Sequence, residues 1–198
     1  MLSHDHKLIF VHVPKTAGTS LMEALQMKPT PFPGHWRPTG FQPYRDHWNQ
    51  YFTTTCVRNP WSRVASMYHY ARGKYGDGHR QIPLFQCCSR VTFEEFVMNH
   101  IHKKENWQIG PCSWWFEDGY DYDYIMRFEN IDQDFRHVCS KVGANIQLGK
   151  HNITGGYDVE NCRHMYTNDA MVKKIESYYA EDIERFGYSL KAPVEEIK

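Results

Sequence analysis

A lysine, a glycine and three hydroxyl side chains follow directly after an apolar run near the start of the chain. The run, residues 8–13, is predicted to form a buried parallel strand. It stops at Pro14 and opens into Lys15-Thr16-Ala17-Gly18-Thr19-Ser20. Ammonium and hydroxyl groups are donors that suit phosphate oxygens. This segment is therefore a candidate loop for binding a nucleotide phosphate.

The positions after this loop have the apolar spacing of a helix, at Leu21, Met22, Ala24 and Leu25. A strand, a short loop and a helix together point backbone N–H groups and the positive end of a helix dipole at an anion. The loop is not a Walker A loop, which has two glycines and ends in a lysine followed by Ser or Thr. Taken alone, it also fits an ordinary turn with Thr19 or Ser20 as the N-cap.

A second candidate cluster follows another predicted strand. Residues 51–57 are rich in β-forming side chains and end at Arg58, and Pro60 suits the first turn of a helix predicted to run to about Ala71. The carboxyl end of a strand is where open α/β sheets bind ligands. Ser66 lies two turns into that helix. Taken singly, Arg58 also fits a surface ion pair, and Ser66 a solvated helix position.

Together the two segments resemble the sulfotransferase superfamily, whose donor is 3′-phosphoadenosine 5′-phosphosulfate. VHVPKTAGTSL looks like its 5′-phosphosulfate loop and CVRNPWSRVASMY like its 3′-phosphate motif. Both are similar to the carbohydrate sulfotransferase branch, which comprises Golgi enzymes and bacterial relatives. Residues 124–143 and 166–188 resemble later elements of that branch, so the resemblance covers most of the chain and is weakest at 28–50 and 72–122.

The resemblance implies a donor site in this chain. The 5′-phosphosulfate is expected at Lys15, Thr16, Ala17, Gly18, Thr19 and Ser20, several of them through backbone N–H groups, and the 3′-phosphate at Arg58 and Ser66. Lys15 is also expected to be catalytic, because charge that builds on the leaving 5′-phosphate oxygen favours a cation there in the transition state. No metal is expected, because a sulfonyl group carries less negative charge than a phosphoryl group.

The acceptor hydroxyl needs a general base beside it. In the resembling branch a Gly-His carries this role, so His35 in the segment FPGHWRP is the predicted base. His47 is the reserve candidate, and His12 is expected to pack within the sheet. Tryptophans that would stack on sugar faces are a guess from residue type alone: Trp36, Trp107, Trp114 and Trp115.

The remaining patterns predict one α/β domain over residues 1–198, a P-loop-like three-layer sandwich with a central, mainly parallel sheet flanked by helices. Residues 28–50 contain five prolines and are expected to be irregular. The further expected elements are a helix capped by Thr92 and Glu95, a strand over 123–127, a helix capped by Asn130 and ending at Gly143, and a closing helix over 168–186.

Composition narrows the class of partner. Lys and Arg balance Asp and Glu at 23 each, so nothing indicates a nucleic-acid or membrane-surface binder. The sequence shows no signal peptide or spanning segment. We therefore expect a soluble cytoplasmic enzyme of bacterial or viral type, with a trimmed lumenal domain of a Golgi enzyme as the alternative. The six cysteines are expected to be mostly thiols.

The predicted function is in-line transfer of a sulfonyl group from 3′-phosphoadenosine 5′-phosphosulfate to a hydroxyl acceptor, with a carbohydrate or glycolipid favoured. A lipid-linked sugar, a small alcohol or a tyrosine side chain stays open as the acceptor, and so does the oligomeric state. Two other classes are also open. One is a P-loop-type small-molecule kinase, and the other is a non-catalytic glycan- or nucleotide-binding module on the same fold.

Overall fold

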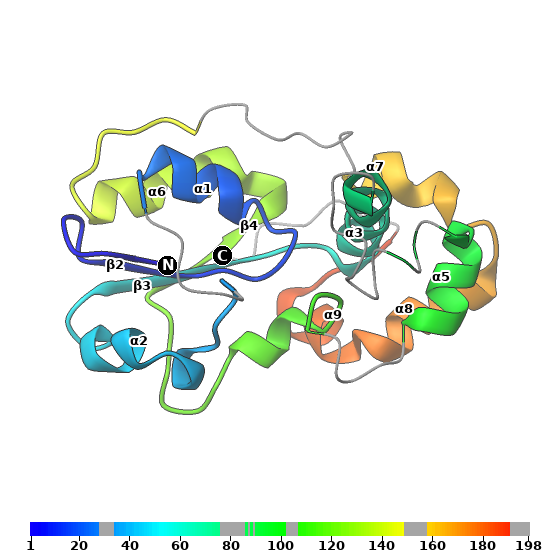
Figure 1. Ribbon diagram of the computed structural model, residues 1–198, viewed down its shortest axis with the longest axis horizontal. Coiled ribbons are helices and arrows are strands. Elements are labelled where there is room, and N and C mark those ends of the chain that lie inside the picture. The colour runs from blue at the N-terminus through cyan, green and yellow to red at the C-terminus, as the bar shows by residue number, and fades with distance from the viewer. Residues whose placement is uncertain are drawn as a thin grey trace. The chain divides into compact units, whose positions relative to one another are not determined.

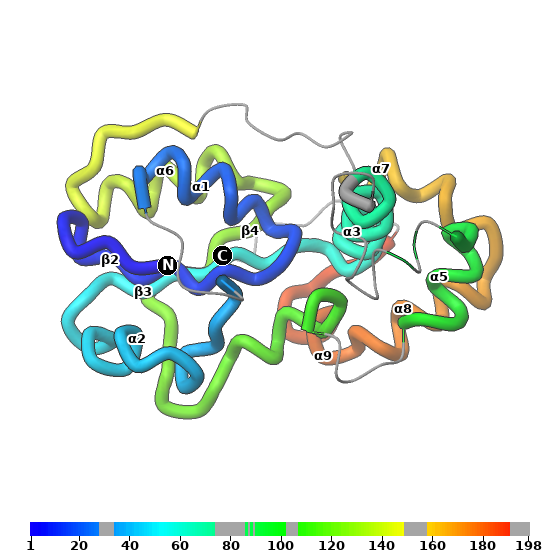
Figure 2. The backbone as a smooth tube through the Cα atoms, in the orientation of Figure 1, coloured from blue at the N-terminus to red at the C-terminus, as the bar shows by residue number. Residues whose placement is uncertain are grey.

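The computed structural model describes residues 1–27, 34–75, 86, 88, 90–101, 107–148 and 158–190. The chain divides into two compact units, shown as a ribbon in Figure 1 and as a backbone tube in Figure 2. The first unit comprises residues 1–58 and 112–153, and the second comprises 59–111 and 154–198. No helix in the described part of the chain is long and apolar enough to cross a membrane.

The first unit is built on a sheet with the strand order β1-β2-β3-β4. Its strands are β1 (Leu2–Ser3), β2 (Leu8–Val11), β3 (Phe52–Val57) and β4 (Tyr124–Arg127). β1 pairs antiparallel with β2, whereas β2–β3 and β3–β4 are parallel. The predicted mixed α/β class and mainly parallel sheet are therefore confirmed, while the P-loop-like designation stays a prediction.

Helices lie on both faces of this sheet. In Figure 1, α1 (Gly18–Ala24) and α6 (Ile131–Lys141) lie on one side, and α2 (Gln42–His47) lies on the other. Strand side chains alternate between the faces. The face toward α1 and α6 forms one apolar core, which includes Leu8, Phe10, Cys56, Met126, Leu21 and Phe135. Burial of these side chains holds the carboxyl ends of β2 and β3 in place.

The second unit is helical in its described residues. Its helices are α3 (Pro60–Tyr75), α5 (Phe93–His100), α7 (Val159–Cys162), α8 (Asp169–Tyr178) and α9 (Ala180–Phe186). They enclose a core that includes Trp61, Val64, Phe96, Met171, Ile175 and Tyr179. The predicted capping box at the start of α5 is present, because the Thr92 hydroxyl accepts from the Glu95 N–H and the Glu95 carboxylate accepts from the Thr92 N–H.

The closing helix, predicted to be continuous over 168–186, is two helices that meet at Tyr179. The Tyr179 side chain is almost fully buried and its hydroxyl donates to the Ile109 carbonyl. This tertiary anchor accompanies the break, which sequence periodicity alone does not reveal. Asn130 makes no side-chain cap bond at α6, so the predicted cap there is wrong.

The proline-rich stretch is more regular than predicted over residues 38–47. A 3₁₀ helix, η1 (Pro38–Gly40), is followed directly by α2, and each begins with a proline in its first two positions. Proline has the right φ for a first helical turn and needs no hydrogen bond from its nitrogen there. These prolines therefore start short helices.

Candidate active site

The predicted phosphate loop leaves the carboxyl end of β2 through a strained backbone. Lys15 and Ala17 both have a φ of 65°, the left-handed region that non-glycine residues rarely adopt. Such strain costs about 1–3 kcal/mol per residue and gathers at ligand sites. Helix α1 then begins with Ala17 as N-cap and no side-chain cap bond. The ordinary turn capped by Thr19 or Ser20 is therefore not what the chain forms.

The hydroxyl side chains of the predicted phosphate loop differ in how deeply they are buried. Thr16 is fully buried, and its hydroxyl donates to the Val13 carbonyl at 2.8 Å. Ser20 is buried and Thr19 is exposed. Because the Thr16 hydroxyl holds the loop's own backbone, the contact of Thr16 with an anion would come from its main-chain N–H group.

Arg58 lies against this loop. It directly follows β3, is only 4% exposed, and its Nη1 donates to the Lys15 carbonyl at 3.1 Å. Its guanidinium carbon lies 3.8 Å from the centre of the Phe128 ring. The guanidinium is therefore buried against the loop and an aromatic face and does not lie at the surface. The contact of Phe128 with Arg58 was not predicted from the sequence. The sequence signal that could have indicated it is the position of Phe128 just after the predicted strand over 123–127.

Lys15 is the second cation of this cluster. Burial, and secondarily the nearby Arg58, lowers the pKa of Lys15 to about 8. Two cations held close together at the ends of parallel strands create a local positive potential in a chain of zero formal net charge. The arrangement is suited to an anionic ligand.

Gly18 is required by the ring of His12. A Cβ at position 18 would lie 2.0 Å from His12 Cδ2 and 2.1 Å from His12 Nε2. His12 therefore packs under the start of α1, next to the loop. Its pKa lies well below the usual value, chiefly because of burial and then because of His35, so the His12 ring is neutral.

We predict that Gly18→Ala lowers the free energy of unfolding by about 1–3 kcal/mol, because an added methyl group must displace either His12 or the loop. Thermal unfolding of Gly18→Ala and of Gly73→Ala measures this. Gly73 lies in α3, and a Cβ added there would have no neighbouring atom within 4 Å, so it is the matched control. Adding His12→Ala should recover much of the loss, whereas equal effects of the two glycine variants would contradict the prediction.

His35 contacts the same segment through its ring. Its Nδ1 lies 2.9 Å from the His12 carbonyl oxygen, and the two imidazole rings are 4.1 Å apart between centroids. A carbonyl oxygen can only accept, so Nδ1 carries the hydrogen and the neutral ring keeps its lone pair on Nε2. This is the tautomer that a general base requires at Nε2.

Ser66, the other predicted ligand of the 3′-phosphate, is buried on α3 in the second unit. The reserve base His47 stacks on Tyr51, just before β3 begins. Because β3 is about 20 Å long, His47 lies at the opposite edge of the sheet from Arg58.

A described pocket of about 320 Å³ also lies at that opposite edge. It is lined by Trp48, Asn49, Tyr51, Thr53, Gly119, Asp121 and Asp123. Trp115, one of the tryptophans considered for sugar stacking, is 2% exposed and belongs to the interior, whereas Trp36 is half-buried and stacks on Phe41. The cationic cluster and the pocket are therefore separate features of the first unit.

The first unit is thus an α/β structure whose strained loop, two cations and the imidazole of His35 gather at the carboxyl ends of parallel strands. The model of the sulfotransferase family matches residues 1–189, and the chain belongs to that family. The resemblance drawn from the two motifs is therefore confirmed. No curated protein and no solved structure matches the chain. Family membership supports sulfonyl transfer to an acceptor as the general reaction.

Proposed function

We propose that this protein transfers a sulfonyl group from 3′-phosphoadenosine 5′-phosphosulfate to a hydroxyl acceptor, with a carbohydrate as the favoured acceptor. The observation that carries the proposal is the meeting of Arg58 and His35 at one loop. Arg58 bonds the Lys15 carbonyl, and His35 bonds the carbonyl of His12, whose ring packs against Gly18. These contacts support a site in which a loop suited to an anion and an imidazole suited to a base lie at one edge of the sheet.

Each of the proposed site groups has one role in the proposed transfer of the sulfonyl group. His35 Nε2 takes the proton of the acceptor hydroxyl as its oxygen forms a bond to sulfur. The bond between sulfur and the 5′-phosphate oxygen breaks, and the ammonium of Lys15 stabilises the charge left on that oxygen. Backbone N–H groups of residues 15–20 would hold the phosphosulfate. No metal ion takes part in this scheme.

The 3′-phosphate is proposed to bind the guanidinium of Arg58, whose planar fork suits bidentate contact with phosphate oxygens. Ser66 is proposed as a further ligand of the same phosphate. The proposal also treats residues 1–198 as one P-loop-like sulfotransferase domain, consistent with a family match that extends over residues from both units.

Calorimetry tests the donor site. Adenosine 3′,5′-bisphosphate is titrated into the protein without magnesium, followed by adenosine 5′-monophosphate. We expect much tighter binding of the bisphosphate. Arg58→Ala should weaken bisphosphate binding by about 10- to 100-fold, the worth of hydrogen bonds to a charged group, and leave the monophosphate nearly unaffected. Arg58→Lys, which keeps the charge and loses the fork, is the matched variant.

Two results would count against the proposal. Equal affinity for the two nucleotides would remove the 3′-phosphate site. Equal weakening of both nucleotides by Arg58→Ala would show that Arg58 acts only by supporting the loop through the Lys15 carbonyl. Binding of ATP that requires magnesium would instead favour the kinase class.

A further inference from the structure

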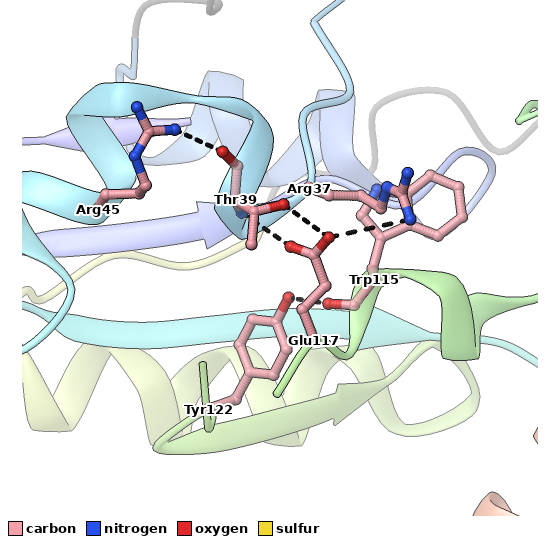
Figure 3. A network of polar contacts seen from close by, with 6 residues as sticks. All are labelled: Arg37, Thr39, Arg45, Trp115, Glu117 and Tyr122. Atoms are coloured by element: carbon pink, nitrogen blue, oxygen red, sulfur yellow. Dashed lines mark hydrogen bonds and ion pairs between the residues drawn. The ribbon is translucent and has the colours of Figure 1, made fainter. Parts of the chain in front are cut away.

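A carboxylate from a distant segment holds the chain just beyond His35. Figure 3 shows Glu117 accepting from both donors of Thr39, the backbone N–H and the hydroxyl, each at 2.8 Å. Arg37 Nη1 lies 3.9 Å from the same carboxylate, and Arg45 donates to the Thr39 carbonyl. Thr39 is therefore held through its N–H, its hydroxyl and its carbonyl.

The segment that carries Glu117 is itself anchored. The Tyr122 hydroxyl donates to the Trp115 carbonyl at 2.6 Å, as Figure 3 also shows. This hydrogen bond links the chain before Glu117 to the chain after it. The Tyr120 N–H donates to the Glu117 carbonyl at 3.0 Å. Trp48 packs edge-on against Tyr120 and Tyr122, with ring centroids 5.1 and 5.3 Å apart. The segment that carries Glu117 is thus held in place, so its carboxylate has a defined position.

The held residues continue directly into the predicted base. Trp36, the neighbour of His35, stacks on Phe41 with ring centroids 6.0 Å apart. It also lies against η1, since a Cβ at Gly40 would be 3.4 Å from its Cε3. Phe41 in turn packs edge-on against the fully buried Tyr44. A shift of η1 would therefore move Trp36 and with it the backbone of His35.

We propose that Glu117 is a positioning residue for His35, an inference that rests on the proposed function. The hydrogen bond of His35 to the His12 carbonyl fixes one side of the ring, and the grip of Glu117 on Thr39 fixes the backbone that leads away from it. The first constraint acts on the ring and the second on the backbone that carries it, and both bear on the direction of Nε2. Misplacement by about 1 Å can cost on the order of a hundredfold in rate.

The grip depends on two polar atoms at the end of side chain 117. Thr39 presents two donors, and the two oxygens of Glu117 accept one each. A glutamine can keep much of this arrangement, because its oxygen can accept from the Thr39 N–H while its NH₂ donates to the Thr39 hydroxyl oxygen. Glu117→Ala removes both accepting oxygens and therefore breaks the grip. Thr39→Ser keeps both donors, and Thr39→Val removes only the hydroxyl.

The experiment compares Glu117→Ala, Glu117→Gln, Thr39→Val and Thr39→Ser in the full chain, with the exposed Glu184→Ala as a control for loss of a glutamate. Readouts are kcat and KM for an acceptor taken from a screen of the wild-type protein, the calorimetric affinity for adenosine 3′,5′-bisphosphate, and hydrogen exchange of the Thr39 amide. We expect Glu117→Ala to lower kcat by about 10- to 100-fold and to speed exchange at Thr39, and Glu117→Gln to keep much of the wild-type rate. Bisphosphate affinity should change less than twofold, Thr39→Ser should behave as wild type, and Thr39→Val should be intermediate.

Each contrary outcome has one meaning. Unchanged kcat in Glu117→Ala, with an active wild type, overturns the positioning role. A loss of bisphosphate affinity equal to the loss of kcat also overturns it, because the effect would then be a general disturbance of the loop. A wild type that binds no bisphosphate and transfers nothing overturns the proposed function itself, and the exchange rate at Thr39 still decides whether the grip exists.

Discussion

Replacing His35 by alanine is expected to lower the rate of sulfonyl transfer by about 10²- to 10⁴-fold, the range that a positioned general base contributes. The reason lies in its tautomer. Nδ1 donates to the His12 carbonyl, so the lone pair of the neutral ring, which we propose removes the acceptor proton, is on Nε2. Single-turnover transfer from loaded donor measures the loss separately from product release.

The donor should still bind to this variant. His35 makes no proposed contact with either phosphate, so the calorimetric affinity for adenosine 3′,5′-bisphosphate should stay near that of the wild type. His47→Ala is the matched control, because His47 lies at the other edge of the sheet, stacked on Tyr51. An active His35→Ala protein would assign the base to another residue, and an inactive His47→Ala protein would make His47 the first candidate.

Replacing Lys15 by alanine is expected to lower transfer by about 10²- to 10³-fold, the cost of removing one group aimed at charge that develops in the transition state. Bisphosphate binding should be weaker but still detectable, because Arg58 and the backbone N–H groups of the loop are retained. The measurement is the ratio of kcat to bisphosphate affinity. If kcat falls no further than the affinity does, Lys15 binds the donor equally in ground and transition states and is not catalytic.

The lowered pKa of Lys15 gives the same role a pH signature. With a pKa of about 8 in the ligand-free protein, Lys15 is mostly charged at pH 7 and mostly neutral above pH 9. An anion binds the charged form better, so bisphosphate affinity should fall as pH rises through about 8, by up to tenfold per unit. Lys15→Arg, which stays charged throughout this range, should show a flat profile. An equally steep fall in that variant would place the titrating group elsewhere.

Local signals in the sequence predict much of the fold. The apolar run ahead of Pro14, the β-rich run ahead of Arg58 and the capping box at Thr92 each depend on neighbouring residues, and each corresponds to an element that the structure contains. The helix that starts at Pro60 is also present and extends to Tyr75, beyond its predicted end near Ala71. Its residues 61–68 are buried on every side, so an apolar stripe on one face is a poor guide to where this helix ends.

The site followed from the sequence only in part. Residue type and order, together with the family resemblance, pointed to Lys15, His35 and Arg58 as candidates. They did not reveal that Arg58 is buried on Phe128, that Thr16 turns its hydroxyl toward the backbone, or that His12 lies against Gly18. Each of these contacts joins parts of the chain whose side-chain directions depend on how the loop and strands pack.

By itself the sequence determined the family, the mainly parallel sheet and the loop that follows its first long strand, because strand runs, caps and a phosphate motif are written in adjacent residues. Only the tertiary structure decided the tautomer of His35, the lowered pKa of Lys15 and the grip of Glu117 on Thr39. The pairing of β2 with β3 brings residues 15 and 58 together, and the packing around Trp48 and Tyr122 brings 39 and 117 together. Electrostatic and hydrogen-bonding interactions depend on distances of a few ångströms in space. Such distances cannot be inferred from how far apart two residues lie along the chain.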